Sequence, residues 1–230
     1  MKKSKIFFPL FVFVLLSLSA GELLARAQKT IAVLYFENNS LAKRDEMEPL
    51  RKGLADMFIT EFSKIGQFKV VERSRLEQLI QEMQLGQSGM LDSKTAQQVG
   101  KLLGAQNLVF GSYMNMYDGK MRIDVRIVEV ETGLTIKAEE ATGKAKDLYK
   151  LVSKLVVKII KNLDVRVSKA DVLRLSQIEN KSFDAALYYA KGLEYEDAGD
   201  VDNAKKMYSK ALKKNKNFTK AKQRLQALSR

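Results

Sequence analysis

The sequence predicts an α+β fold: a mixed sheet of roughly five strands packed with helices, followed by an all-α C-terminal segment. Short apolar runs between residues 30 and 142 have the length and composition of strands. Stretches with apolar residues at helical spacing lie between and after these runs. Beyond Ser168 the chain is rich in Ala, Lys and Tyr and has a helical pattern throughout.

The chain begins with features of a secretory signal peptide, predicted to cover residues 1–27. Lysines precede an apolar run of about 13 residues, and Ala25-Arg26-Ala27 is a small-x-small cleavage site. Cleavage is therefore expected between Ala27 and Gln28. An uncleaved anchor is the alternative, but a spanning helix needs about 20 apolar residues. The chain has no cysteine, so no thiol can be acylated and the protein is not expected to be a lipoprotein.

An α+β domain is predicted over residues 28–163. The expected strands are residues 30–36, 68–71, 108–116, 121–130 and 134–142, with helices from Pro49, from a capping box formed by Ser74 and Glu77, and over 146–163. Asp118-Gly119 predicts a tight hairpin. The apolar alternation shifts between Ile127 and Val128, which predicts a β-bulge there.

A helical segment like a tetratricopeptide repeat is predicted over residues 164–230. The repeat spacing of aromatic and small residues is matched by Tyr188, Gly192, Tyr195, Ala204, Tyr208 and Ala211. Ala198-Gly199-Asp200 is the expected turn between the paired helices. One repeat cannot bury both of its faces, so it must pack on the preceding domain, on the last helix or on another chain.

Positive charge is concentrated in the last third of the chain. Residues 28–143 contain 15 Lys/Arg and 16 Asp/Glu, whereas residues 144–230 contain 21 and 10. Four of these lysines, Lys146, Lys150, Lys154 and Lys158, recur at four-residue spacing on the helix over 146–163. The stripe is either the solvated face of an amphipathic helix or a partner-binding surface, with peripheral contact to an anionic surface possible. With it, the tyrosines Tyr188, Tyr195 and Tyr208 are the candidate partner-binding residues.

The sequence lacks the usual residues of catalysis and of cofactor binding. The chain has no histidine and no cysteine, and it contains neither phosphate-binding glycine motif. No catalytic, cofactor or metal site is therefore expected, and the protein is expected not to be an enzyme.

Several segments resemble the CsgG/HfaB family, in the same order, over residues 30–163. They are IAVLYFEN, LRKGLADMFITEF, KVVERSRLEQLIQEMQLGQSG, GKLLGAQNLVFGSY and RIDVRIVEVETG. The resemblance implies an exported bacterial envelope protein whose α+β domain serves assembly or secretion. The best known member forms a secretion channel with long membrane hairpins, whereas the turns here, at Tyr117–Lys120 and Glu131–Gly133, are short.

These observations together predict a periplasmic, non-catalytic assembly, accessory or scaffold factor for a cell-envelope or secretion complex. Its expected partners are envelope proteins, with homo-oligomer formation left open and no nucleic acid. Two alternatives remain: a subunit of a curli-type outer-membrane channel, and a periplasmic activator of a peptidoglycan synthase, because a similar fold occurs in such activators.

Overall fold

The computed structural model describes residues 28–83, 93–163, 165, 167–176 and 182–229. The expected signal peptide, residues 1–27, lies outside them. The strands are β1 (Lys29–Val33), β2 (Glu37–Asn38), β3 (Phe68–Val70), β4 (Asn107–Asn115), β5 (Lys120–Glu129) and β6 (Thr135–Lys144). The helices are α2 (Arg44–Met47), α3 (Leu50–Phe62), α4 (Arg73–Glu82), α5 (Ser93–Leu102), the 3-10 helix η2 (Ala145–Asp147), α6 (Leu148–Asn162), α7 (Lys169–Ser176), α8 (Phe183–Asp197), α9 (Val201–Lys214) and α10 (Thr219–Ala227).

The sheet is mixed, as predicted, and has the order β3-β1-β4-β5-β6. β1 pairs in parallel with β3 and β4, whereas β4, β5 and β6 form antiparallel pairs. The expected strand over residues 30–36 ends earlier, at Val33. The amide of Phe36 donates to the carbonyl of Arg51 instead of to a strand, and the chain then rejoins the sheet as β2, beside β4. This short strand makes the sheet six-stranded rather than five-stranded.

Both predicted features of the antiparallel half are confirmed. The β4–β5 hairpin turns at Asp118-Gly119, where Gly119 has a φ of 75° and Asp118 Oδ1 accepts from the Lys120 amide at 3.0 Å. The register of β5 against β6 shifts between Ile127 and Val128, at the predicted bulge.

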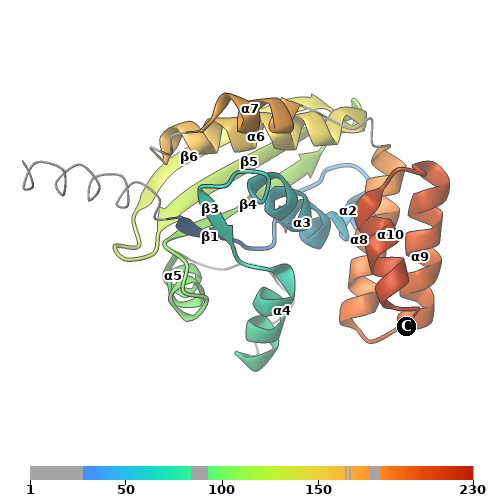
Figure 1. The fold of residues 1–230 in the computed structure, drawn as a ribbon. Coiled ribbons are helices and arrows are strands. Elements are labelled where there is room, and N and C mark those ends of the chain that lie inside the picture. Colours follow the sequence, from blue (N-terminus) through green and yellow to red (C-terminus); the bar gives the residue numbers. More distant parts are fainter. Residues whose placement is uncertain (1–27, 84–92, 164, 166, 177–181, 230) are drawn as a thin grey trace, which may run out of the picture.

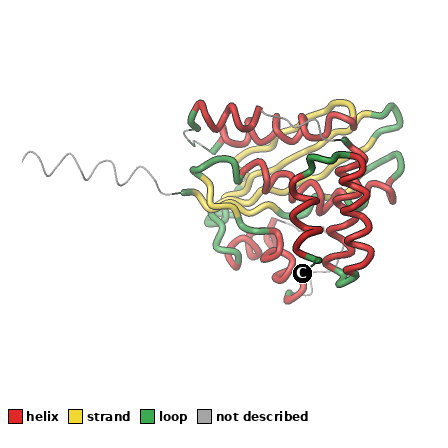
Figure 2. The backbone as a smooth tube through the Cα atoms, turned by 45° about the vertical axis from the view of Figure 1, so that its right-hand side comes forward, coloured by secondary structure: helices red, strands yellow, loops and turns green. Residues whose placement is uncertain are grey.

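Helices cover the two faces of the sheet (Figures 1 and 2). α3 and α6 lie on one face over a large apolar cluster that includes Phe36, Phe58 and Phe62. α4 and α5 cover part of the other face, over a smaller cluster with Leu34, Leu76 and Val99. This layered α+β arrangement is the predicted class of fold.

The predicted capping box at the start of α4 is wrong. The helix begins at Arg73, its N-cap is Glu72, and no side chain caps it. Ser74 therefore lies inside the first turn. Glu77 does not reach back to the backbone because its carboxylate accepts from the Tyr35 hydroxyl and pairs with Lys52.

The C-terminal helices form an antiparallel hairpin, α8 and α9, with α10 packed against α9 (Figure 1). The turn lies at the predicted Ala198-Gly199-Asp200: Gly199 has a φ of 76°, and Asp200 Oδ1 accepts from the Asn203 amide. Within the hairpin the Tyr208 ring packs directly on Gly192, where a Cβ atom would lie 2.4 Å from the ring.

The α8–α9 hairpin packs both on the preceding domain and on α10. These are two of the three packing partners that the sequence left open. α8 lies against α3, where Ala190 approaches Gly53 so closely that a Cβ on Gly53 would lie 2.7 Å from the Ala190 Cβ. Leu175, Ala186 and Ala190 belong to the same apolar cluster as the sheet. No helix among the described residues is both long and apolar enough to cross a membrane.

Candidate interaction surfaces

The lysine stripe lies along η2 and α6, opposite the apolar face of α6 that covers the sheet. Two of its members are engaged within the chain. Lys150 pairs with Asp147 at 3.0 Å, and Lys158 pairs with Glu139 at 3.0 Å and donates to the Glu140 carbonyl. The others, Lys146 and Lys154, are exposed. Hydrogen bonds from Asn162 and Lys158 lower the pKa of Glu139, which keeps this carboxylate charged and the contact between α6 and β6 in place.

The three candidate tyrosines have different surroundings. Tyr195 is 37% exposed on α8. Tyr188 is half-buried, with the Lys210 ammonium 5.5 Å from its ring centre. Tyr208 is fully buried, and its hydroxyl donates to Glu196. A partner at the surface cannot reach the Tyr208 ring, so the expectation that this residue binds a partner is corrected: it packs the hairpin.

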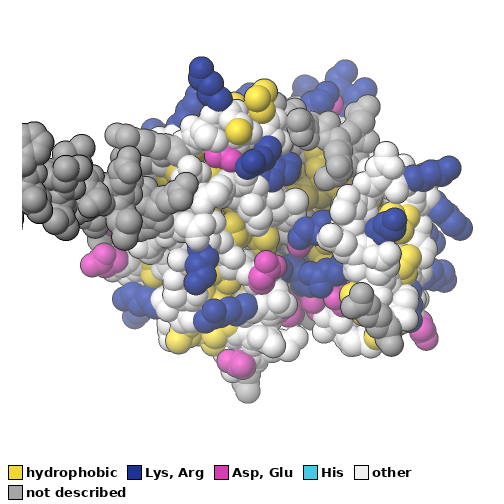
Figure 3. Space-filling model, viewed as in Figure 1, with side chains coloured by type: hydrophobic (Ala, Val, Ile, Leu, Met, Phe, Trp, Pro, Cys, Tyr) yellow, Lys and Arg dark blue, Asp and Glu magenta, His cyan; other side chains and the backbone are white. Residues whose placement is uncertain are grey.

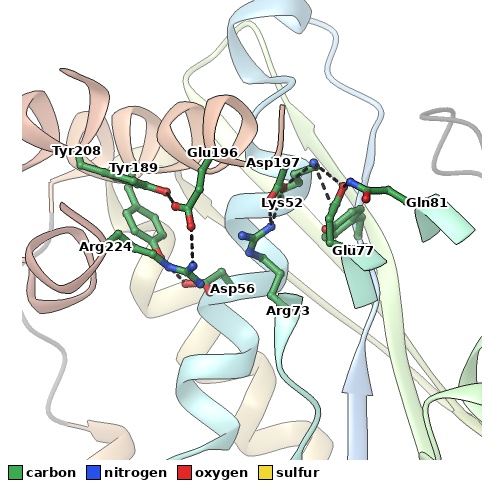
Figure 4. A network of polar contacts seen from close by, with 11 residues as sticks. Lys52, Asp56, Arg73, Glu77, Gln81, Tyr189, Glu196, Asp197, Tyr208 and Arg224 are labelled. Atoms are coloured by element: carbon green, nitrogen blue, oxygen red, sulfur yellow. Dashed lines mark hydrogen bonds and ion pairs between the residues drawn. The ribbon is translucent and has the colours of Figure 1, made fainter. Parts of the chain in front are cut away.

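A network of buried charges joins the hairpin to the sheet domain (Figure 4). Asp197, in the last turn of α8, accepts from Arg73 Nη1 at 2.7 and 2.9 Å and from Lys52 Nζ at 2.7 Å. The Arg73 side chain is 3% exposed and that of Asp197 is 10% exposed. Burial alone would lower the pKa of Arg73, but the hydrogen bond and charge of Asp197 raise it overall. The guanidinium therefore stays charged and requires this carboxylate.

Tyr35 extends this network into the sheet domain. Its hydroxyl donates to Glu77, which also pairs with Lys52 at 3.3 Å, and the Lys52 ammonium lies 5.4 Å from the Tyr35 ring centre. Burial, and then the hydrogen bond to Glu77, raise the pKa of Tyr35, so the phenol stays a donor. Lys52 is thus shared between α4 and α8.

A second group of polar contacts lies about Asp56 of α3. Asp56 is 3% exposed; it accepts from the Tyr189 hydroxyl at 3.0 Å and pairs with Lys220 of α10 at 3.5 Å. Glu196 lies next to this group and accepts from Tyr208 and from Arg224, the latter at 2.9 Å. Three helices of the C-terminal segment are therefore bound to each other and to α3 by charged hydrogen bonds.

Sequence reasoning missed most of these residues. Lys52, Asp56, Arg73 and Asp197 occur in ordinary helical patterns, and their partners lie up to 145 residues away in the sequence. One signal was available: Asp56 falls among the apolar residues of α3, where a charged side chain is buried only if it is paired.

One half of a sheet face, over β4, β5 and β6, has no helix on it among the described residues. Its centre is an ion-pair cluster in which Arg122 binds Asp124 at 2.7 Å and also pairs with Glu140. Half-buried Phe110 and Met114 flank the cluster on β4. This face, together with the exposed side of the hairpin, is a surface on which a protein partner has room to bind.

The described residues contain no group of three or more acidic, His or Cys side chains that could hold a metal ion. The arrangement is thus an α+β domain with a firmly attached helical hairpin and two open polar surfaces.

Residues 14–120 match the model of a protein family described as curli production assembly/transport component CsgG. This match confirms the resemblance to the CsgG family that the motifs of this region show. The match ends at residue 120, so the tetratricopeptide-like pattern of the C-terminal helices stays a prediction.

Several solved structures resemble the chain in part. The LpoB C-terminal domain from Salmonella enterica is 21% identical, with a TM-score of 0.37, and the match covers 56% of this chain and 93% of that one. LpoB of E. coli is 16% identical over 52% of this chain and 58% of its own, with a TM-score of 0.42. The lipoprotein GNA1162 of Neisseria meningitidis is 15% identical over 58% and 98%, with a TM-score of 0.40. No curated protein sequence matches the chain.

Proposed function

We propose that the protein is a non-catalytic, exported component of the bacterial cell envelope that acts as an assembly, accessory or scaffold factor through protein–protein contacts. The family match supports the role in envelope assembly or transport. The lack of histidine and cysteine supports a role without catalysis. The signal-peptide pattern of residues 1–27 supports a periplasmic location.

The observation that best supports a scaffold role is the buried junction of Arg73, Lys52 and Asp197. It fixes the helical hairpin against α3 and α4, so the hairpin holds one position relative to the sheet domain. A loosely tethered tail would not need a carboxylate that binds the buried Arg73 and the partly buried Lys52 together. A fixed surface binds a partner without first losing conformational entropy, which favours affinity.

In vivo photo-crosslinking tests this proposal. A crosslinking amino acid is placed at Arg126 of the open sheet face, at Tyr195 of the hairpin, or at Lys69 of the edge strand β3 as a control. All three positions are exposed. We expect the first two to capture the same envelope protein, identified by mass spectrometry, and Lys69 to capture none. Capture of no protein at either site would contradict the proposal.

Two further readouts separate the alternatives. Recovery of the protein in carbonate-washed membranes would favour a subunit of a secretion channel. Capture of a peptidoglycan synthase would favour an activator of that enzyme. We expect release by carbonate, because the β4–β5 and β5–β6 turns are as short in the structure as in the sequence.

A further inference from the structure

Three segments that are distant in the sequence meet at one end of the molecule. The tip of the β4–β5 hairpin lies beside the start of η2, because Lys120 pairs with Lys144 across the strands and the Ala145 amide donates to the Gly119 carbonyl at 3.0 Å. The start of α6 lies beside the α9–α10 turn, because the rings of Tyr149 and Phe218 contact each other with centres 6.4 Å apart.

This end, which we call the basic end, is rich in exposed lysines. They come from all three segments and are Lys120, Lys144, Lys146, Lys150, Lys213, Lys214 and Lys216. Three of them pair with aspartates, in the contacts Lys120–Asp118, Lys150–Asp147 and Lys214–Asp184. Positive charge remains in excess, and Figure 3 shows lysine and arginine side chains gathered over this end and along α9.

The stability of the fold does not account for this charge. Lys144, Lys146 and Lys150 lie before or within the first turn of α6, where the helix dipole disfavours cations. Only Lys213 and Lys214, in the last turn of α9, are placed favourably for their own helix.

The chemistry of the basic end fits an anionic lipid surface better than a protein. Protein interfaces favour arginine and are depleted in lysine, and all seven cations here are lysines. Lysines near an anionic bilayer each strengthen binding by about fivefold. Tyr117, at the hairpin tip, is 84% exposed in the midst of these lysines. Tyrosine is enriched at the headgroup level of membranes.

We propose that the basic end binds peripherally to anionic phospholipid headgroups, with Tyr117 at the membrane–water interface. The hairpin tip and the start of α6 would then face the membrane. The open sheet face and the exposed side of the hairpin remain available to a protein partner.

Vesicle co-sedimentation tests the charge part of the proposal. The chain from Gln28 onward contains every described helix and strand. We expect it to bind vesicles that contain phosphatidylglycerol, not vesicles of phosphatidylcholine alone, and to dissociate as salt shortens the Debye length. The triple variant Lys144→Glu, Lys146→Glu, Lys216→Glu should bind at least about 100-fold more weakly.

The matched control changes the same amount of charge elsewhere. Lys69→Glu, Lys101→Glu, Lys137→Glu alters three exposed lysines on β3, α5 and the far end of β6. We expect this variant to keep most of the binding. An equal loss in both triple variants, or no binding by the unmodified chain, would overturn the proposal. If the basic-end variant instead loses capture of an acidic envelope protein and vesicles are never bound, the surface is a protein-docking site.

A fluorescence experiment tests the position of Tyr117. The chain has no tryptophan, so Tyr117→Trp introduces a single probe. Its emission should shift to shorter wavelength with phosphatidylglycerol vesicles and stay unchanged with phosphatidylcholine. Leu102→Trp, at a position on α5 that is 53% exposed, should show no shift with either. A shift at position 102 but not at 117 would contradict the proposed orientation.

Discussion

The sheet domain and the C-terminal helices are packed in different ways. In the sheet domain, phenyl rings pack on each other without polar groups: Phe36 stacks on Phe58 with centres 5.1 Å apart, and Phe62 meets Phe68 at 5.6 Å. In the C-terminal helices two of the large buried side chains are tyrosines, and Phe218 packs against one of them. Tyr189 lies 5.6 Å from Tyr208, and each hydroxyl donates to a carboxylate.

This difference in packing means that the two parts depend on the exact positions of their neighbours to different degrees. Apolar burial is non-directional, so the sheet domain tolerates small shifts of its helices. Buried charges demand specific partners at hydrogen-bond distance, so the hairpin has one position on the domain. We therefore expect substitutions in the two parts to have different consequences, one global and the other local.

The largest effect is expected from Phe58→Ala. The side chain is fully buried between Phe36 and Phe62, and its removal leaves a cavity in the main core. We expect a loss of about 3–5 kcal/mol in the free energy of unfolding, measured by urea denaturation. Loss of stability should extend to both parts of the chain. A loss below about 1 kcal/mol would show that this core is not what stabilises the domain.

Asp197→Asn should act on the junction. It leaves the buried Arg73 guanidinium without its counter-charge, which costs roughly 3 kcal/mol. We expect faster hydrogen exchange in α8, α9 and α10 and little change in β5. Asp184→Asn is the matched control, because its pair with Lys214 is exposed and contributes less than about 1 kcal/mol. Equal effects of the two substitutions would mean that the junction does not hold the hairpin.

Gly192→Ala tests the tyrosine packing of the hairpin alone. The new Cβ would lie 2.4 Å from the Tyr208 ring, so the ring or the helix must move, at a cost of about 1–3 kcal/mol. Thermal unfolding and limited proteolysis between α8 and α9 measure the effect. Gly66→Ala has nothing within 4 Å of the added atom, and we expect it to be nearly neutral.

The fold was predictable from the sequence wherever local pattern determines it. Alternating or continuous apolar residues identify the main strands, and the shift at Ile127 and Val128 identifies the bulge. Asp118-Gly119 identifies the hairpin because its backbone needs a positive φ. The two-residue strand β2 was missed since two residues carry no period.

The junction was not predictable, because its energetics depend on contacts far apart in the sequence. Arg73 and Asp197 are 124 residues apart, and each alone resembles a solvent-exposed helical charge. The repeat spacing identifies Tyr208 as a candidate partner-binding residue, but it does not show which face of the helix is buried. The basic end likewise depends on the Tyr149–Phe218 contact, although the excess of lysine in this third of the chain was visible in the composition.

The smallest effect is expected from Glu194→Gln. This substitution tests whether the Glu194 carboxylate lowers the stability of the fold, in contrast to Asp197, which stabilises it. Burial raises the pKa of Glu194, and the charge of Lys52 only partly opposes this. At pH 7 the ionised side chain therefore costs free energy in the folded state. The substitution removes this cost and should stabilise the protein by about 0.5 kcal/mol.

The effect of Glu194→Gln on the free energy of unfolding should depend on pH. Below the unfolded pKa of about 4.3 the carboxyl is neutral in both states, so the substitution should have no effect there. The stabilisation should appear as the pH rises through the unfolded and then the folded pKa. Urea unfolding at both ends of this range measures it, with exposed Glu131→Gln as the control. Destabilisation at pH 7 would instead mean that Glu194 belongs, like Asp197, to the charges that hold the hairpin in place.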